Sequence, residues 1–246
     1  MSDVRPDPDA IDYRRFYADA ERVVDYDRLV GAEDFERRLL PALASLVDLD
    51  DAAVLEVGVG TGRVTELLLG AGARVIGCEP AEAMCAAARR RLARYGADRL
   101  ALFVEGVHDL SLPSGQFDLA VAGWVLGHFI DWHGPRWRDE IDRALVIMDK
   151  ALAPNGVLAI IETLGTGQSE PTPPTSGLAE FYTWLERERG FHRTVVRTDY
   201  LFADVDSAAS IMRAFFGPDM AAHVRALGRA RVPECTGIWS RRKGRG

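Results

Sequence analysis

The chain has 246 residues, 48% of them hydrophobic, which is enough for one large domain with a buried core. Its formal net charge of −7 argues against nucleic acid as a substrate, because phosphates need clustered lysine and arginine. The three cysteines lack the Cys-x-x-Cys spacing of zinc or redox sites, and no metal-ligand cluster is evident. The first ten residues do not resemble a secretory signal, and the longest apolar run is too short to cross a bilayer. We therefore expect a cytoplasmic protein with neither membrane nor nucleic-acid partners.

The N-terminal 50 residues have a helical pattern. Apolar residues recur at three- and four-residue spacing over 11–29 and again over 35–47, which predicts two lead-in helices.

From Ala52 the pattern changes to short Val-, Leu- and Ile-rich runs that alternate with alanine- and arginine-rich helical stretches, as in parallel βαβ units. The expected strands are 53–57, 74–79, 100–104, 117–123 and 157–162, and the expected helices are 62–70, 81–95 and 136–152.

The last third of the chain begins with a loop over 165–177, rich in Pro, Thr, Ser and Gly, which we expect to lie over a site. A helix over 178–189, a strand over 191–202, helices over 206–216 and 219–230, and a final strand over 232–239 are predicted to follow.

Three glycines, Gly58, Gly60 and Gly62, alternate between the first predicted strand and the following helix. Such a turn needs residues that tolerate positive φ, lets a ligand approach the backbone and presents amide N–H groups to its anionic end. Nicotinamide dinucleotide sites use Gly-x-Gly-x-x-Gly, whereas here Arg63 stands where that pattern has its third glycine. This departure weakens the dinucleotide interpretation.

A carboxylate, Glu79, ends the second predicted strand, 17 residues beyond Gly62. There it is well placed to accept two hydrogen bonds from ribose hydroxyls. The loop and the carboxylate together favour an adenosine-type cofactor over a purely structural turn.

These motifs resemble those of the class I S-adenosylmethionine-dependent methyltransferases of the small-molecule type. Residues 54–62 match the family's first motif, 75–84 its second and 152–158 its late Leu-x-Pro-Gly-Gly turn, and Phe117-Asp118 also matches. The resemblance covers residues 50–165 well and the flanks in outline.

The resemblance implies an α/β, three-layer, Rossmann-like fold with a seven-stranded mixed sheet, the last strand antiparallel, and an N-terminal helical lid. On this basis residues 1–246 form a single methyltransferase domain. Within it, residues 1–50 would be the lid, 51–165 the cofactor-binding core and 166–246 the substrate cover with the final strands.

The resemblance also implies a set of cofactor contacts. Glu56 would help to hold the amino group of the methionine moiety, Glu79 would bind the ribose and Met84 would flank the adenine. Arg63 is a candidate partner for the cofactor carboxylate, the alternative being an exposed helix arginine. The other implied cofactor-binding residues are Gly58, Gly60, Gly62, Pro80, Trp124 and Tyr26, the last as a lid tyrosine or as plain helix packing.

The adenine segment departs from the family pattern. Gly106 occupies the place where relatives often carry an aspartate that meets the adenine amino group. Adenine recognition would then depend on backbone groups near Val107, or on Glu105 or His108.

Methyl transfer depends mainly on holding the reactants in line in a dry site, and it needs no metal or covalent nucleophile. An acceptor hydroxyl would benefit from a base, commonly histidine. His128 and His133 follow the fourth predicted strand, at the sheet edge where open α/β folds bind ligands. They are the catalytic candidates, and the alternative for His128 is a packed histidine that caps the turn.

Aromatic residues near the expected site are candidates either for the acceptor pocket or for the core: Trp132, Trp137, Phe181, Tyr182, Trp184 and Tyr200.

The predicted function is methyl transfer from S-adenosylmethionine to an oxygen or nitrogen of a small molecule, with S-adenosylhomocysteine as product. Two alternatives stay open. The bound cofactor could serve only as a fixed charge in a rearrangement or cyclisation, or the chain could be a non-catalytic binding module on the same fold.

Overall fold

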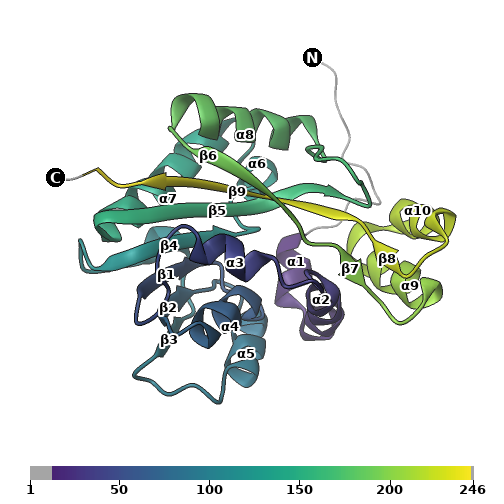
Figure 1. The fold of residues 1–246 in the computed structure, drawn as a ribbon, viewed down its shortest axis with the longest axis horizontal. Helices are drawn as coiled ribbons and strands as arrows, with labels where there is room; N and C mark the ends of the chain where they lie inside the picture. The colour runs from purple at the N-terminus through teal and green to yellow at the C-terminus, as the bar shows by residue number, and fades with distance from the viewer. Residues whose placement is uncertain (1–12, 245–246) are drawn as a thin grey trace.

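A computed structural model describes residues 13–244 of the chain (Figure 1). Two stretches lie outside this range. They are residues 1–12, which belong to the expected lid and include the stretch considered as a secretory signal, and residues 245–246 at the end of the expected substrate cover. No helix between residues 13 and 244 is both long and apolar enough to cross a membrane.

The centre of the molecule is a seven-stranded sheet in the order β3-β2-β1-β4-β5-β9-β6. The first five strands pair in parallel, and β9 runs antiparallel to both β5 and β6. The strands are β1 Ala53–Val57, β2 Arg74–Cys78, β3 Leu100–Phe103, β4 Phe117–Gly123, β5 Leu152–Thr166, β6 His192–Arg197 and β9 Glu234–Arg242. The mixed sheet with an antiparallel last strand confirms the predicted fold class.

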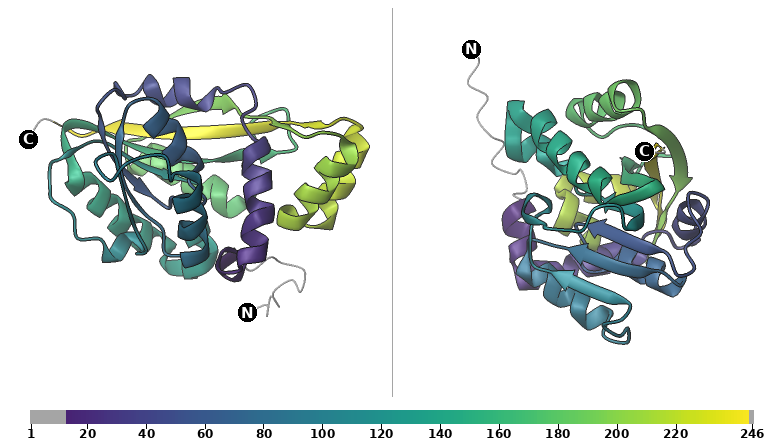
Figure 2. Two further views of the ribbon diagram at one scale, coloured as in Figure 1. Left: turned by 90° about the horizontal axis from the view of Figure 1, so that it is seen from below. Right: turned by 90° about the vertical axis from the view of Figure 1, so that its left-hand side faces the viewer.

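Helices cover both faces of this sheet, because its central strands are apolar on both sides. One face packs against α3 Leu39–Ala44, α4 Arg63–Gly70 and α5 Glu82–Arg91. The other packs against α7 Trp137–Ala151 and α8 Ser176–Glu188. Figures 1 and 2 show the resulting three layers.

A helical cover lies beside the sheet, and it joins the two ends of the described chain. It consists of α1 Tyr13–Ala18, α2 Ala20–Ala32, the short pair β7 Tyr200–Leu201 and β8 Arg231–Val232, α9 Val205–Phe216 and α10 Pro218–Leu227. Leu29 of α2 packs in one apolar cluster with Met212 of α9 and Val224 of α10, and α2 lies beside α9 in both views (Figures 1 and 2). The N-terminal lid therefore rests on C-terminal helices.

The predicted strands and helices of the core are confirmed to within a few residues, except that β5 begins five residues earlier and ends four later than the expected 157–162. Three further predictions were wrong in detail. The lead-in segment holds three helices, because Asp19 accepts the N–H of Glu21 and so starts α2 separately from α1. The predicted strands 191–202 and 232–239 each divide in two, the latter at Pro233, which has no N–H to donate to a ladder.

Most of the candidate pocket aromatics belong to the core. Trp137, Phe181, Tyr182 and Trp184 are at most 6% exposed and pack between the sheet and its helices. This outcome favours the core alternative for these four residues, while Trp132 and Tyr200 lie nearer the candidate site.

Candidate active site

The glycine loop connects β1 to α4 in a left-handed conformation. Gly58, Gly60 and Gly62 have φ of 73°, 58° and 88°, and the N–H groups of Gly58 and Val59 donate to the Cys78 carbonyl of β2 at 2.8 and 3.1 Å. A Cβ added at Gly58 would lie 2.1 Å from Cγ2 of Val125. A Cβ at Gly60 would meet only the Tyr26 hydroxyl, at 4.0 Å. The loop therefore packs tightly at Gly58 and leaves room for a ligand at Gly60.

Glu79 is held at the end of β2 by two backbone hydrogen bonds. One oxygen accepts the N–H of Gly60 and the other that of Ala81, each at 2.9 Å. Burial raises the pKa of Glu79, although both hydrogen bonds favour its ionised form. The carboxyl is thus fixed against the glycine loop, where a ribose hydroxyl could reach its remaining lone pairs.

Glu56, one residue before the end of β1, is a buried acid with an unused oxygen. It is 2% exposed, and no described residue bonds to its Oε2. Burial raises the pKa of Glu56 to about 8, although hydrogen bonds from Thr65 act to lower it. A buried, unpaired carboxyl oxygen is costly unless a ligand satisfies it. A cationic amino group, such as that of a methionine moiety, would do so.

The adenine side of the expected site is less clearly formed. Met84 of α5 is buried, and Pro80, two residues before this helix, is exposed. Val107 begins a short 3-10 helix, Val107–Asp109, and is also buried. The ring of His108 bonds through Nε2 to the Glu140 carbonyl of α7 at 3.0 Å. These four adenine-side contacts stay predictions, and both ring nitrogens of His108 lie near Glu140, since Nδ1 is 3.7 Å from Glu140 Oε2.

Arg63 is not an exposed helix residue. Its Nη1 lies 2.7 Å from Glu33 Oε2, and the arginine and glutamate side chains are 15% and 4% exposed. The guanidinium also stacks 4.1 Å from the ring centre of Trp124, which has a φ of 54°. Arg63 therefore links the core helix α4 to the end of the lid and to the segment after β4.

A cavity of about 580 Å³ opens between the sheet edge, the lid and the C-terminal helices. Tyr26, Arg63 and Trp124 line its cofactor side. The predicted covering loop contributes to it through Gln168 and Thr172. Its remaining walls come from α1, α2, the end of β5, α6, β7, α8, β9, α9 and α10. The aromatic members are Tyr13, Tyr17, Tyr200, Phe215 and Phe216.

His128 begins α6, His128–His133, and lies on the cavity wall. Its Nε2 is 3.0 Å from the Tyr17 hydroxyl, and its ring stacks on Trp132 at 5.0 Å. Burial lowers the pKa of His128 to about 4, so the imidazole is neutral at neutral pH. His133, at the other end of α6, packs against Phe129 and is not among the cavity-lining residues. The structure thus brings only the first of the two candidate histidines to the cavity, while both catalytic roles stay predictions.

Sequence reasoning missed Tyr17 and four acids in the cavity wall, of which Asp131 of α6 is exposed and the other three are buried. Glu162, 4% exposed on β5, accepts the N–H of Gly127 at 2.9 Å. Glu234, 1% exposed at the start of β9, accepts the Thr163 hydroxyl at 2.7 Å. Glu33, the third buried acid, is the partner of Arg63. A single acid after the apolar run of β5 was the available signal for Glu162, whereas no motif marks the others.

Burial raises the pKa of Glu162 and of Glu234 to about 8, and repulsion from Glu33 adds to the shift of Glu234. Within residues 13–244 no three His, Cys, Asp or Glu side chains come together as a metal site.

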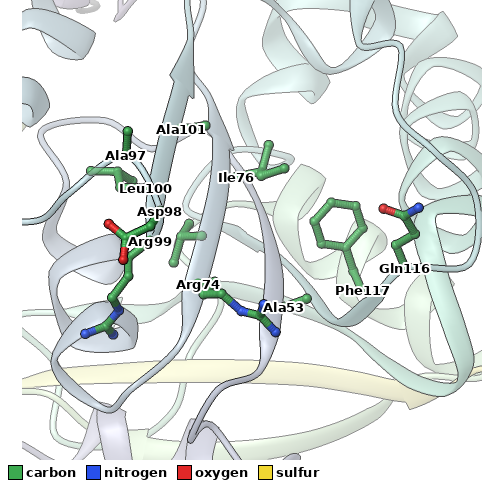
Figure 3. Close-up of a pocket in the computed structure, with 11 residues that line it drawn as sticks. Ala53, Arg74, Ile76, Ala97, Asp98, Arg99, Leu100, Ala101, Gln116 and Phe117 are labelled. Atoms are coloured by element: carbon green, nitrogen blue, oxygen red, sulfur yellow. The ribbon is translucent and has the colours of Figure 1, made fainter.

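A second hollow, of about 500 Å³, lies at the amino ends of the strands (Figure 3). Its two arginines are already occupied: Arg74 pairs with Asp51, and Arg99 donates to the carbonyls of Leu69 and Ala73. Because open α/β sheets bind ligands at the carboxyl ends of their strands, the 580 Å³ cavity beside the glycine loop is the candidate active site.

Comparisons with known proteins show what the chain is similar to. A family model described as a methyltransferase domain matches residues 55–160. An uncharacterized methyltransferase of Alkaliphilus oremlandii is 31% identical over 54% of this chain, and the match spans only about half, 55%, of that relative's length. An uncharacterized methyltransferase of Bacillus cytotoxicus is 28% identical over 71% of this chain and 76% of its own.

The fold also matches solved structures. Phosphoethanolamine N-methyltransferase 2 of Haemonchus contortus, in complex with S-adenosyl-L-methionine, aligns with a TM-score of 0.57. The alignment covers 96% of this chain and 61% of that one at 14% identity, a likeness of fold. The family match over residues 55–160, the curated relatives and the sheet topology together support the predicted class I S-adenosylmethionine-dependent methyltransferase family and its cofactor.

Proposed function

We propose that this chain transfers the methyl group of S-adenosylmethionine to an oxygen or nitrogen of a small molecule bound in the 580 Å³ cavity. The observation that carries the proposal is the position of that cavity, directly beside the glycine loop and lined by Arg63, Trp124 and His128. Its volume falls within the roughly 300–1,000 Å³ of small-molecule pockets.

The residues at the loop suit the cofactor. When bound, S-adenosylmethionine supplies a methyl group on a sulfonium sulfur and is released as S-adenosylhomocysteine. Glu56 Oε2 would accept hydrogen bonds from the amino group, since no described residue uses that oxygen. Gly60 would leave room for the cofactor beside the backbone. Glu79, fixed by Gly60 and Ala81, would hold the ribose hydroxyls.

The cavity walls would position the acceptor and exclude water. The lid tyrosines Tyr17 and Tyr26 contact each other edge to face, and Tyr26 also packs against Phe215 of α9. Such a cover keeps the reacting groups aligned in a dry site, where proximity can supply most of the rate enhancement.

His128 would orient the acceptor and receive its proton through the Tyr17 hydroxyl, which would accept the acceptor's proton and pass its own to Nε2. The imidazole is neutral because its pKa is lowered to about 4, so it is always available as a proton acceptor but is a weak base. The Tyr17 hydroxyl, 3.0 Å from Nε2, fixes the ring orientation. We therefore expect His128 to contribute more through positioning than through basicity.

Calorimetry with S-adenosylmethionine and S-adenosylhomocysteine tests the cofactor site. Both should bind at micromolar concentrations, and Gly60→Arg should abolish binding because the new side chain fills the cleft. Gly115→Arg is the matched control, since Gly115 has a φ of 73° in an open turn with no neighbouring atom within 4 Å. Absence of binding by the wild-type protein would contradict the proposal.

Mass analysis of reactions with candidate metabolites tests the chemistry. A product that has gained one methyl group supports methyl transfer. A product of unchanged mass would favour a rearrangement or cyclisation instead, and no turnover together with a co-purifying protein would favour a binding module.

A further inference from the structure

The acids in the cavity wall outnumber its cations. Arg63 is the only arginine or lysine among the described residues that line the cavity, and it is already paired with Glu33. Glu162 and Glu234 line the same cavity, and neither forms an ion pair with a described residue, although Arg63 is near enough to lower the pKa of Glu234. Burial holds both carboxyls largely protonated near pH 7, and a cationic ligand would lower their pKa and bind the ionised form, which a neutral or anionic ligand could not do.

Glu234 has an unused oxygen that lies deep in this wall. The residue is 1% exposed, and Thr163 donates to its Oε1 at 2.7 Å. Oε2 is buried and receives no hydrogen bond from the described residues. Glu33 Oε1 is likewise buried without such a partner. Buried acceptors in this state call for a ligand that donates hydrogen bonds.

The aromatic walls fit a cation as well. Tyr13, Tyr17 and Tyr200 line the same cavity, together with Phe215 and Phe216. The faces of aromatic rings attract an ammonium group, and the attraction increases when water is excluded. Burial raises the pKa of all three tyrosines, so their hydroxyls stay neutral near pH 7.

We propose that the acceptors of this chain carry a cationic amine, which binds to the acids of the cavity wall, Glu234 foremost, beside its aromatic side chains. The proposal rests on the small-molecule methyl transfer proposed above and adds a substrate class to it. The ammonium is the recognised group of the acceptor, and it is separate from the question of which oxygen or nitrogen is methylated.

The cofactor's own positive charge is the main competing occupant. Its amino group has a separate candidate partner in Glu56, which is not among the cavity-lining residues. The sulfonium is absent from S-adenosylhomocysteine, so protein saturated with that product isolates the contribution of the acceptor. A metal ion is disfavoured by geometry, because the described acids do not form a three-ligand cluster.

Three probes with the same phenol ring test the proposal by calorimetry on the full chain saturated with S-adenosylhomocysteine at pH 7. They are tyramine, which is a cation, 4-ethylphenol, which is neutral, and 4-hydroxyphenylacetate, which is an anion. Tyramine should bind about 10- to 100-fold more tightly than 4-ethylphenol, which corresponds to one or two hydrogen bonds between charged groups. The anion should bind most weakly.

Glu234→Gln should remove the preference for tyramine and leave the affinity for S-adenosylhomocysteine unchanged, because the amide oxygen can still accept the Thr163 bond. Glu162→Gln is a second variant for the same readout. Glu180→Gln is the matched control, since Glu180 is an exposed residue of α8 that pairs with Arg138, and it should keep the preference.

Equal binding of the three probes to the wild-type protein would overturn the proposal. So would a Glu234→Gln variant that loses affinity for S-adenosylmethionine but not for S-adenosylhomocysteine, because the carboxyl would then serve the sulfonium. Failure of the wild-type protein to bind S-adenosylhomocysteine would instead refute the proposed function, so the two failures are distinguishable.

Discussion

Alanine substitution at two glycines of the same loop should impair different properties, stability in one case and cofactor affinity in the other. Gly58→Ala should destabilise the fold, whereas Gly60→Ala should mainly reduce cofactor affinity. The difference follows from the surroundings, because a Cβ at Gly58 would lie 2.1 Å from Val125 Cγ2 and a Cβ at Gly60 would have no atom closer than the Tyr26 hydroxyl at 4.0 Å. Both residues have positive φ, so the backbone cost is shared.

A third variant separates the backbone cost of alanine at positive φ from the cost of overpacking at Gly58. Placing alanine in the left-handed region costs about 1–2 kcal/mol, and Gly115→Ala measures this cost alone, since Gly115 has a φ of 73° and open surroundings. Overpacking at Gly58 adds about 1–3 kcal/mol. For a chain of this length the added cost corresponds to a further decrease in Tm of about 2–12 °C.

The assay combines chemical denaturation with calorimetry of S-adenosylhomocysteine binding. Gly60→Ala should match Gly115→Ala in stability and lose at least about 10-fold in affinity, or about 1.4 kcal/mol, because its methyl group enters the space left for the ligand. A Gly58→Ala variant no less stable than Gly115→Ala would refute the packing argument. A Gly60→Ala variant with wild-type affinity would refute the assignment of the cleft.

Three further predictions concern the cavity. The folded chain holds the Glu162 proton more tightly than the unfolded chain, because burial raises the pKa of this carboxyl to about 8. The unfolding free energy should therefore fall by up to about 2 kcal/mol on account of Glu162 as the pH rises from 6 to 8. Denaturation of Glu162→Gln should show a smaller fall. Tyr17→Phe should lower kcat more than it changes KM, because it removes the hydroxyl 3.0 Å from His128 Nε2; an unchanged kcat in steady-state assays would argue against the positioning role. Arg63→Met should cost about 3–5 kcal/mol in denaturation experiments by leaving Glu33 buried and unpaired, and a double variant that also carries Glu33→Met should recover most of this loss.

The cofactor half of the protein could be predicted from sequence because its signals are local. The glycines of the loop need positive φ, which the structure shows at all three positions. Glu79 follows β2 directly, and parallel strands bring their carboxyl ends to the same edge. Apolar runs buried on both faces are visible in the sequence as continuous Val, Leu and Ile.

The acceptor half could not be predicted in this way, because its contacts join distant residues. Tyr17 and His128 are 111 positions apart, and Glu234 meets Thr163 across 71 positions. Arg63 could be read from sequence as an exposed helix residue, and only the position of Glu33 at the end of the lid shows that it is buried. Tertiary packing, rather than local pattern, decides such contacts.

The cofactor half and the acceptor half of the protein are therefore held in place by different parts of the fold. The loop after β1 and the acid after β2 are fixed by backbone bonds of the sheet itself, such as those from Gly58 and Val59 to Cys78. The acceptor cavity instead depends on α1, α2, α9 and α10. The last three pack on one another through their own apolar cluster, and α1 contacts α9 through aromatic side chains. A change in these helices can alter the shape and charge of the cavity without disturbing the glycine loop.

Arg63 is the exception, because it belongs to the core helix α4 and yet pairs with Glu33 of the lid. Substitutions at Arg63 should consequently affect cofactor affinity and acceptor affinity together, whereas substitutions at Glu234 should affect acceptor affinity alone.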